Sequence, residues 1–209
     1  KVKVQRIEFV GNENVSDEDL KGKFVMATKE GSLLGFMTGE GAFSLEALDQ
    51  DLRRLEFFYG TRGFAETKID PPVVVSSRDR RFITITITVH EGPKYTVGKV
   101  TVEGDLLFPK EELEKALRLK TGDVFNAEYV HLDDVTLSGR YKDEGYAFAS
   151  VGNAHTLHRD ERVIDFTYVI QKGERAKIGR IDIVGADKTR DWTLRRELRI
   201  YEGELFSQT

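Results

Sequence analysis

The side chains most able to do chemistry in this sequence are its histidines and its paired acids. His155 and His158 stand three residues apart and look like a metal-binding pair. The alternating pattern around them predicts a strand, however, where residues three apart point to opposite faces. Asp133 and Asp134 are neighbours on a predicted helix and so face different directions. Neither pair therefore predicts a metal or acid–base site.

The remaining candidates for catalysis are equally isolated. His90 closes a predicted strand and His131 lies on a predicted helix, each without a partner at ligand spacing. The chain has no cysteine, which excludes disulfides, a thiolate nucleophile and a cysteine zinc site. We therefore expect a protein that is not an enzyme and that uses neither a cofactor nor a metal ion.

A glycine motif raises the possibility of nucleic-acid binding. Gly60-Thr61-Arg62-Gly63 matches the Gly-x-x-Gly loop of KH modules. That loop joins two helices in KH domains, whereas here it joins a predicted helix to a predicted strand. The corresponding stretch from Gly139 to Gly145 lacks the motif, and the net charge is −4. We therefore expect no nucleic-acid partner.

The same stretch gains meaning from its repetition. The pattern Tyr-x-x-x-Gly-aromatic-Ala occurs twice, 82 residues apart. A helix-like pattern precedes each copy and a strand-like pattern follows it, so each glycine is expected to end a helix in a left-handed conformation. The aromatic residue is expected to fold back onto that helix. The structural residues of this motif are Tyr59, Gly63 and Phe64 in the first copy and Tyr141, Gly145 and Tyr146 in the second.

Other elements recur with the same period. Strand-like phrases that run into a turn at a glycine occupy residues 2–12, 95–105 and 176–185. Each is followed by a short amphipathic helix, which Ser16 can cap in the first copy. Ser44 and Asn126 are good caps for a second helix. The chain begins at Lys1 without an initiator methionine, which suggests a fragment of something longer.

The repeats predict an α+β protein made of tandem βααββ units. Each unit is expected to hold a three-stranded mixed sheet covered on one face by two helices. The predicted units are residues 1–93, residues 94–175, and a truncated start of another unit at 176–209, either frayed or docked on a neighbour. The first unit has a long inter-helix loop at 30–42, which either packs on its own unit or presents an apolar contact patch.

Each unit should leave a strand edge open. Pro71 and Pro72 place the 65–77 strand at an edge, whereas the unbroken 82–89 strand suits the centre. An open edge offers unpaired backbone groups to another extended chain, weakly and with broad tolerance. The alternative is that the edges are idle and the units are spacers. The candidate peptide-binding residues are Ala65, Glu66, Thr67, Lys68, Ile69, Val73, Val74 and Val75 in the first unit, and Ala149 and Val151 in the second.

The order of these motifs resembles a known family. The phrases Ile-x-Phe-x-Gly-Asn, Gly-x-x-Phe-Ser/Asn and Tyr-x-x-x-Gly-aromatic-Ala, with a closing Glu-Gly, are similar to POTRA (polypeptide-transport-associated) domains of the outer-membrane barrel-assembly superfamily. The loop at 30–42 resembles the third unit of its periplasmic arm. Residues 95–175 resemble the fourth, and residues 180–203 resemble the start of the fifth.

The resemblance implies a scaffold or chaperone-like arm at the periplasmic face of the bacterial outer membrane. Its implied partners are unfolded outer-membrane proteins, accessory assembly lipoproteins and a membrane β-barrel later in the same chain. Apart from the resemblance, the open strand edges themselves predict weak self-association. In this family an edge strand can accept a guest strand by β-augmentation, and the resemblance places that edge strand at Ala65–Ile69 with Val73–Ser77. Pro71-Pro72 departs from the family pattern. The alternative is an interaction or spacer module of another secretion, import or cell-division machine that binds no client.

Overall fold

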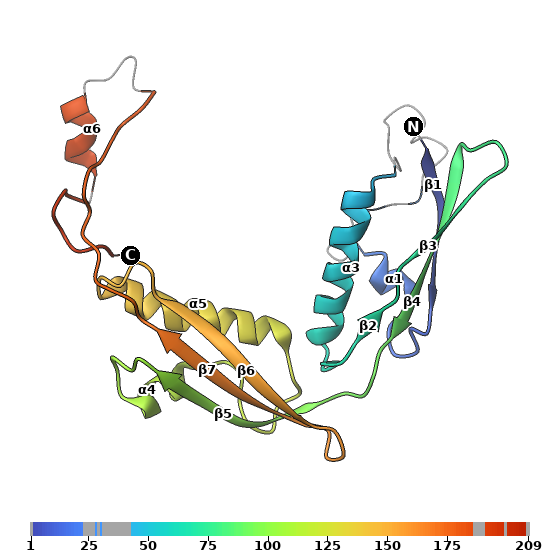
Figure 1. Ribbon diagram of the computed structural model, residues 1–209, viewed down its shortest axis with the longest axis horizontal. Helices are drawn as coiled ribbons and strands as arrows, with labels where there is room; N and C mark the ends of the chain where they lie inside the picture. Colours follow the sequence, from blue (N-terminus) through green and yellow to red (C-terminus); the bar gives the residue numbers. More distant parts are fainter. Residues whose placement is uncertain are drawn as a thin grey trace. The chain divides into compact units, whose positions relative to one another are not determined.

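Figure 1 shows the computed structural model of the chain. It divides into two compact units, one of residues 1–97, 121–129 and 157–164, the other of residues 98–120, 130–156 and 165–209. The predicted loop at 30–42, apart from Glu30, lies outside the described residues. The structure describes residues 2–22, 28, 30, 43–185, 191–198 and 200–207.

The first sheet is built around β4 (Phe82–His90). β1 (Lys3–Val10) pairs with β4 in parallel, which requires the predicted crossover. On the other side, β2 (Lys68–Ile69) and β3 (Val73–Ser76) pair with β4 in antiparallel orientation. The unbroken isoleucine and threonine alternation in β4 buries every second side chain, as a central strand requires. The predicted centre and edge are both confirmed.

The helices of the first repeat begin where the sequence predicts. The Ser16 hydroxyl caps α1 (Asp17–Leu20) by accepting from the Asp19 amide, and the Ser44 hydroxyl caps α3 (Leu45–Gly60) by accepting from the Ala47 amide. The apolar face of α3 packs on the sheet, so that this core is buried between one helical layer and one sheet face. Its fully buried residues include Leu48, Leu55, Tyr59, Ile85 and Ile87.

The second repeat has the same element order. β5 (Thr96–Gly104), β7 (Val163–Gln171) and β6 (Ser150–His158) form a three-stranded sheet with β7 at its centre. α4 (Lys110–Ala116) and α5 (Ala127–Asp143) lie between β5 and β6 in the chain. Buried Leu113 and Leu137 come from these helices, and Tyr168 comes from β7. The predicted α+β class and its βααββ repeat are confirmed. The second sheet has the three strands predicted, whereas the first has four because its edge strand is divided into β2 and β3.

The acidic pair on α5 is structural. The Asp133 carboxylate is fully buried and accepts hydrogen bonds from the backbone amides of Arg118 (2.6 Å) and Leu119 (3.1 Å), and from the Tyr168 hydroxyl (3.0 Å). Asp134 faces another way and accepts from Asn153. Burial raises the pKa of the Asp134 carboxyl. In the first repeat the buried Asp51 likewise accepts from the backbone amide of Thr28, at 2.8 Å.

The repeated motif forms a joint from helix to strand. Gly63 and Gly145 have φ values of 99° and 93°, in the left-handed region that glycine enters without a Cβ clash. Phe64 folds back so that its ring meets the Tyr59 ring edge-on, with centroids 5.6 Å apart. The predicted joint is confirmed at both glycines.

The two joints continue into the chain that follows with the same hydrogen bonds. In the first, the Gly63 carbonyl accepts from the Tyr95 amide at 2.9 Å, and the Tyr95 carbonyl accepts from Phe125 at 3.0 Å. In the second, the Gly145 carbonyl accepts from the Ala176 amide at 2.8 Å, and the Ala176 carbonyl accepts from Phe206 at 3.0 Å. Each set of residues lies within one compact unit.

In its described residues, the C-terminal segment contains the helix α6 (Asp191–Glu197) and an isolated bridge between Lys177 and Leu205. The strand predicted at 176–185 forms no ladder among the residues that the structure describes. It is connected to its own unit through the Gly145–Ala176 hydrogen bond instead. The predicted domain boundaries at 93 and 175 stay a prediction.

Candidate functional site

The exposed strand edge of the first sheet is formed by β3 (Figure 1). All four of its residues are exposed, with Val73 and Val75 at 58%. The β2–β4 register differs by one residue from the β3–β4 register. Asp70, Pro71 and Pro72 therefore form a bulge between β2 and β3, which explains how two prolines fit beside an otherwise regular strand. The augmentation edge is consequently short.

The pairing of β3 with β4 decides which backbone groups remain open. The Ser77 amide donates to the Phe82 carbonyl at 2.8 Å, so alternate residues along β3 bond β4. The backbone N–H and C=O groups of Val73 and Val75 therefore also point toward β4. Those of Val74 and Ser76 point away from the sheet. No other described residue bonds those outward N–H groups. The edge thus offers two donors and their carbonyls to a guest strand.

The opposite edge of the same sheet is less available. The backbone amide of Ile7 in β1 donates to the Glu30 carboxylate at 2.8 Å, and the Val2 carbonyl accepts from Phe43 at 3.0 Å. The Glu30 carboxylate also pairs with Lys21 at 3.0 Å. Among described residues, β3 is therefore the freer edge of this sheet.

Three of the predicted edge residues do not belong to the edge strand. Ala65, Glu66 and Thr67 lie in the turn that follows α3, and the strand resumes only at Lys68 and Ile69 in β2. The turn arises because the Phe64 carbonyl accepts from the Thr67 hydroxyl, and the same hydroxyl also donates to the Glu91 carbonyl. The prediction of a continuous strand from Ala65 is wrong.

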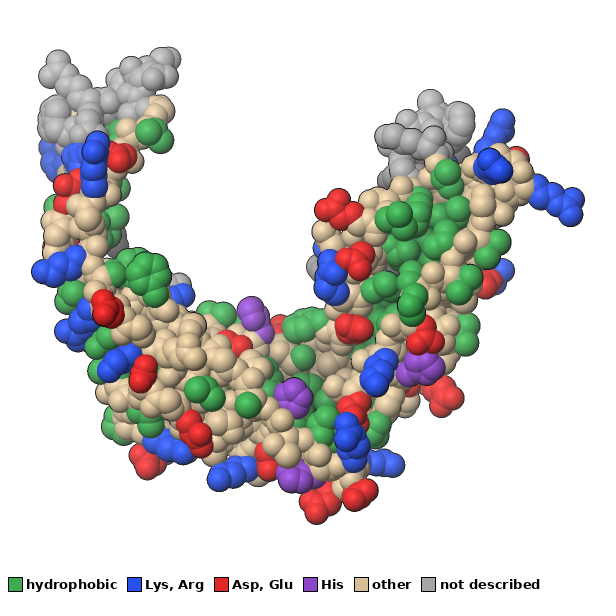
Figure 2. Space-filling model, in the orientation of Figure 1, with side chains coloured by type: hydrophobic (Ala, Val, Ile, Leu, Met, Phe, Trp, Pro, Cys, Tyr) green, Lys and Arg blue, Asp and Glu red, His purple; other side chains and the backbone are tan. Residues whose placement is uncertain are grey.

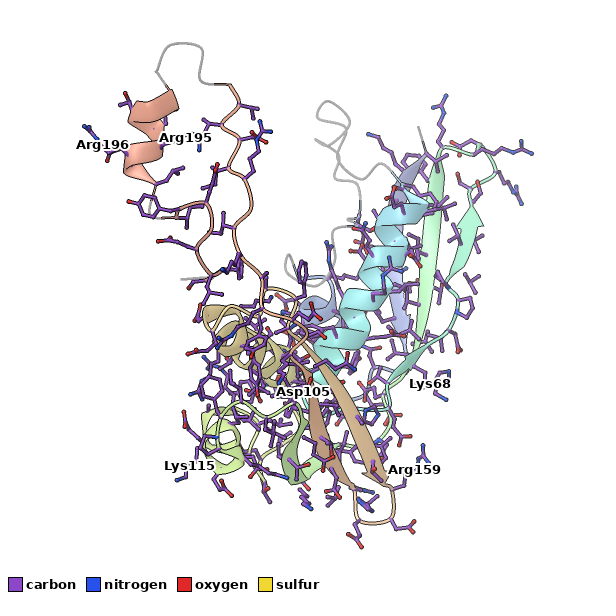
Figure 3. The ribbon with its side chains drawn as sticks, turned by 60° about the vertical axis from the view of Figure 1, so that its left-hand side comes forward. Lys68, Asp105, Lys115, Arg159, Arg195 and Arg196 are labelled. Carbon is purple, nitrogen blue, oxygen red and sulfur yellow. The ribbon has the colours of Figure 1, made fainter. Side chains whose placement is uncertain are left out.

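Glu66 has a different role from the one predicted. Its carboxylate accepts from the Tyr95 hydroxyl and from the Arg159 guanidinium, the latter at 2.7 and 2.9 Å. Arg159 stands at the turn between β6 and β7 (Figure 3), and all three residues belong to the same compact unit. Arg159, and next the Tyr95 hydroxyl, lower the pKa of the Glu66 carboxyl. We call these residues the Glu66 latch.

The sequence gives no signal for the Glu66 latch, because its members are 29 and 93 residues from Glu66. Their types are common on protein surfaces, and nothing in their spacing links them. Only the fold brings them together.

In the second repeat, one of the two predicted edge residues lies in the edge strand and the other does not. Val151 lies in the edge strand β6 and is half-buried. Ala149 precedes β6 and is 95% buried in the core, so it cannot meet a guest. Ala149 is not part of the edge strand because it belongs to the turn after α5, and β6 begins at Ser150.

Two of the four histidines, His90 and His155, make ordinary structural contacts. His155 stacks on Phe166 with ring centroids 5.6 Å apart, and His90 Nε2 lies 2.9 Å from an Asp70 carboxylate oxygen. Within the described residues no group of three or more metal-ligating side chains gathers. The helices described there are too short or too polar to cross a bilayer.

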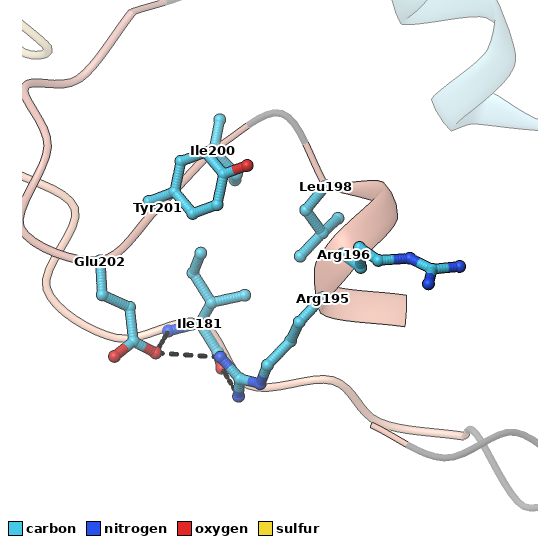
Figure 4. A pocket seen from close by; sticks show the side chains of 7 residues that line it. All are labelled: Ile181, Arg195, Arg196, Leu198, Ile200, Tyr201 and Glu202. Carbon is cyan, nitrogen blue, oxygen red and sulfur yellow. Dashed lines mark hydrogen bonds and ion pairs between the residues drawn. The ribbon is translucent and has the colours of Figure 1, made fainter. Parts of the chain in front are cut away.

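One apolar pocket lies in the C-terminal segment (Figure 4). Glu202 accepts from the Ile181 amide at 2.9 Å and from Arg195 at 3.2 Å, and Arg195 also donates to the Ile181 carbonyl. These bonds close one side of a hollow that exposes part of Ile200 and Tyr201. Its lining residues are Ile181, Arg195, Arg196, Leu198, Ile200, Tyr201 and Glu202.

Comparison with known proteins gives a consistent result. The POTRA family model, described as surface antigen variable number repeat, matches residues 2–92 and 95–173. The outer membrane protein assembly factor BamA of Nitratidesulfovibrio vulgaris is 31% identical over 99% of this chain and 26% of its own length. That of Neisseria meningitidis is 32% identical over 96% of this chain and 25% of its own length. The chain thus spans about a quarter of these relatives.

A solved structure agrees with these sequence matches. The crystal structure of Haemophilus influenzae BamA POTRA3-5 superposes with a TM-score of 0.80 at 25% identity. The match covers 99% of this chain and 80% of that one.

Proposed function

The chain belongs to the POTRA family, and from that premise we propose that it works as a periplasmic module of outer-membrane protein assembly. Its activity is to hold extended segments of unfolded outer-membrane proteins by adding them to the β3 edge. The observation that carries this proposal is the outward row of backbone groups at Val74 and Ser76. No cofactor enters this activity.

The guest would extend the first sheet by one strand. Its backbone would pair with the outward N–H and C=O groups of Val74 and Ser76, which allows about four hydrogen bonds. The exposed Val73 and Val75 side chains would pack beside alternate guest residues on the sheet face away from α3. Such recognition depends on backbone shape more than on sequence, which suits a module with many clients.

Affinity at this edge should be low. Four hydrogen bonds at roughly 0.5–1.5 kcal/mol net each give a few kcal/mol, and ordering the guest offsets part of this. We expect dissociation constants between near-millimolar and micromolar. Weak binding lets a client leave again. Accessory lipoproteins could use the same edge or β6, and the chain itself could associate weakly there.

The alternative is that the chain is a spacer or interaction module that binds no client. The shortness of β3, four residues beside a proline bulge, is the observation that favours it. The two functions predict different results when an extended peptide is added.

The test is a titration of the chain with an outer-membrane strand peptide, followed by amide chemical shifts. We compare Val74→Pro, which removes one outward donor, with Val74→Thr, which keeps it. The proline should weaken peptide binding by at least about threefold, because one hydrogen bond is lost. Val74→Thr should bind like the unchanged chain.

The fold of both variants is checked through the shifts of β4 and α3, which should stay in place. Shifts on β3 without a loss in Val74→Pro would contradict the role of the outward donor. No peptide-induced shifts on β3 or β6 would leave the spacer function.

A further inference from the structure

The turn that joins β3 to β4 is strongly basic. Residues 77–81 are Ser-Arg-Asp-Arg-Arg, and the three arginines are exposed. Figure 2 shows basic side chains standing out at this hairpin tip. None of the three forms an ion pair with a described residue. The turn therefore concentrates positive charge in a chain whose net charge is −4.

The shape of this turn is fixed by its own hydrogen bonds. The Ser77 hydroxyl donates to the Asp79 carboxylate at 2.6 Å and accepts from the Phe82 amide at 3.1 Å. The Asp79 carboxylate also accepts from the Arg81 amide at 3.2 Å. The bonds from the Ser77 hydroxyl and the Arg81 amide lower the pKa of the Asp79 carboxyl. The one acid of the turn is thus engaged with the turn itself. The side chains of Arg78, Arg80 and Arg81 are exposed, and three arginines less one aspartate give the turn a net charge of +2.

The second hairpin provides an internal comparison. Arg80 and Arg162 both have φ of 55°, and each donates its amide to the carbonyl three residues earlier. The turns therefore share a backbone conformation. The second turn, Arg159-Asp160-Glu161-Arg162, balances its charges, and its Arg159 is held by Glu66. Of these two described turns, the one beside β3 is the one that carries an excess of positive charge.

The position of the basic turn relates it to the open edge. A guest strand paired with Val74 and Ser76 would run on past Ser76, alongside the turn. Two further guest residues extend roughly 7 Å, within reach of arginine side chains. An opposite charge at that end of the guest would gain a favourable interaction, and a like charge would be repelled.

We propose that the β3 edge selects extended segments that carry carboxylate side chains at the end lying beside the 77–81 turn. The inference rests on the proposed function and names the class of guest. The guest has alternating apolar residues that pack on Val73 and Val75, followed by acidic residues that meet Arg78, Arg80 and Arg81. The observations favour a peptide over a lipid surface because the turn continues an open strand edge.

The test uses one central strand sequence with different ends. Four peptides carry aspartates at the N-terminal end, aspartates at the C-terminal end, glutamines at both ends, or lysines at both ends. In low salt, one of the two acidic peptides should bind about three- to tenfold more tightly than the glutamine peptide. The lysine peptide should bind less tightly. The advantage should shrink at about 0.3 M salt, because screening weakens exposed charge pairs.

A matched pair of variants assigns the effect to the turn. The triple change Arg78→Gln, Arg80→Gln and Arg81→Gln should abolish the acidic advantage and leave the glutamine peptide unaffected. Arg162→Gln changes the equivalent left-handed position of the other turn and should preserve the advantage. Chemical shifts of Asp79 and Phe82 report whether the turn keeps its shape.

The outcomes separate the two proposals. Equal binding of all peptides on β3, or an acidic advantage that survives the triple change, overturns the selection and leaves the edge-binding function standing. Failure of every peptide to shift β3 overturns both. If the triple change weakens binding to anionic lipid vesicles but alters no peptide affinity, the turn serves a membrane surface and the selection is wrong.

Discussion

The two helix-to-strand joints share one backbone and differ in their side chains. At both joints the carbonyl of a left-handed glycine accepts a hydrogen bond from the chain that follows. The donor is the Tyr95 amide at 2.9 Å in the first joint and the Ala176 amide at 2.8 Å in the second. Three residues after Gly63 stands Glu66, which holds Tyr95 and Arg159. Three residues after Gly145 stands Phe148, whose side chain is 80% exposed.

This difference separates what the repeat requires from what each copy adds. The backbone bonds depend on glycine and on chain direction, so they recur wherever the motif recurs. The Glu66 latch depends on three unrelated side chains and occurs at the first joint. The first joint should therefore be more sensitive to substitution and to acid than the second.

The largest expected effect comes from alanine at the joint glycines. A Cβ at Gly63 would lie 2.7 Å from Val124 Cγ1, whereas one at Gly145 would have its nearest contact at 3.4 Å, to Leu205. Both changes force alanine into the left-handed region, at about 1–2 kcal/mol. Gly63→Ala should cost about 1 kcal/mol more, because it also has to displace Val124. Urea unfolding followed by amide resonances of α3 and α5 measures both costs.

A double-mutant cycle checks the cause of the excess. Val124→Ala should remove the clash, so Gly63→Ala in that background should cost about as much as Gly145→Ala. An equal or larger cost at Gly145 in the unchanged chain would contradict the steric comparison.

The smaller expected effect concerns pH at the Glu66 latch. The folded-state pKa of Glu66 lies below its usual value of about 4.3. A lowered carboxyl pKa stabilises the folded state above the unfolded pKa, and this contribution is lost as pH falls through the folded one. We therefore expect the first joint to be less stable once the pH falls below the folded-state pKa of Glu66. Glu66→Gln should remove this part of the pH dependence and leave the second joint unchanged.

The carboxyl carbon shift of Glu66 reports its titration directly. Arg159→Gln should raise the Glu66 pKa, because the hydrogen bond from the Arg159 guanidinium is the main cause of the lowered pKa. Arg162→Gln in the same turn should leave the Glu66 pKa unchanged. A Glu66 titration that is the same in all three chains would show that the latch does not form in solution.

Much of the fold could be predicted from the sequence because its signals are local and repeated. The alternation in 82–89 gave a central strand, and Ser16 and Ser44 marked helix starts through their capping hydroxyls. The paired prolines correctly indicated an edge. Their consequence for register, a bulge at Asp70–Pro72, needed the partner strand β4 to be seen.

The site was predicted less completely because strand ends depend on distant contacts. Ala65, Glu66 and Thr67 match a strand pattern, but the Thr67 hydroxyl bonds the Phe64 and Glu91 carbonyls and keeps the turn. Ala149 is removed from the edge by burial. The basic turn at 77–81, by contrast, is visible in the sequence and becomes meaningful only beside an open edge.

Amide hydrogen exchange at β3 tests the central claim most directly. In the free chain the outward amides of Val74 and Ser76 should exchange quickly, and the inward amide of Val75 should be protected by β4. Adding a saturating strand peptide should slow exchange at Val74 and Ser76 and change Val75 little. Unchanged exchange at Val74 and Ser76 in the presence of bound peptide would contradict strand addition at this edge.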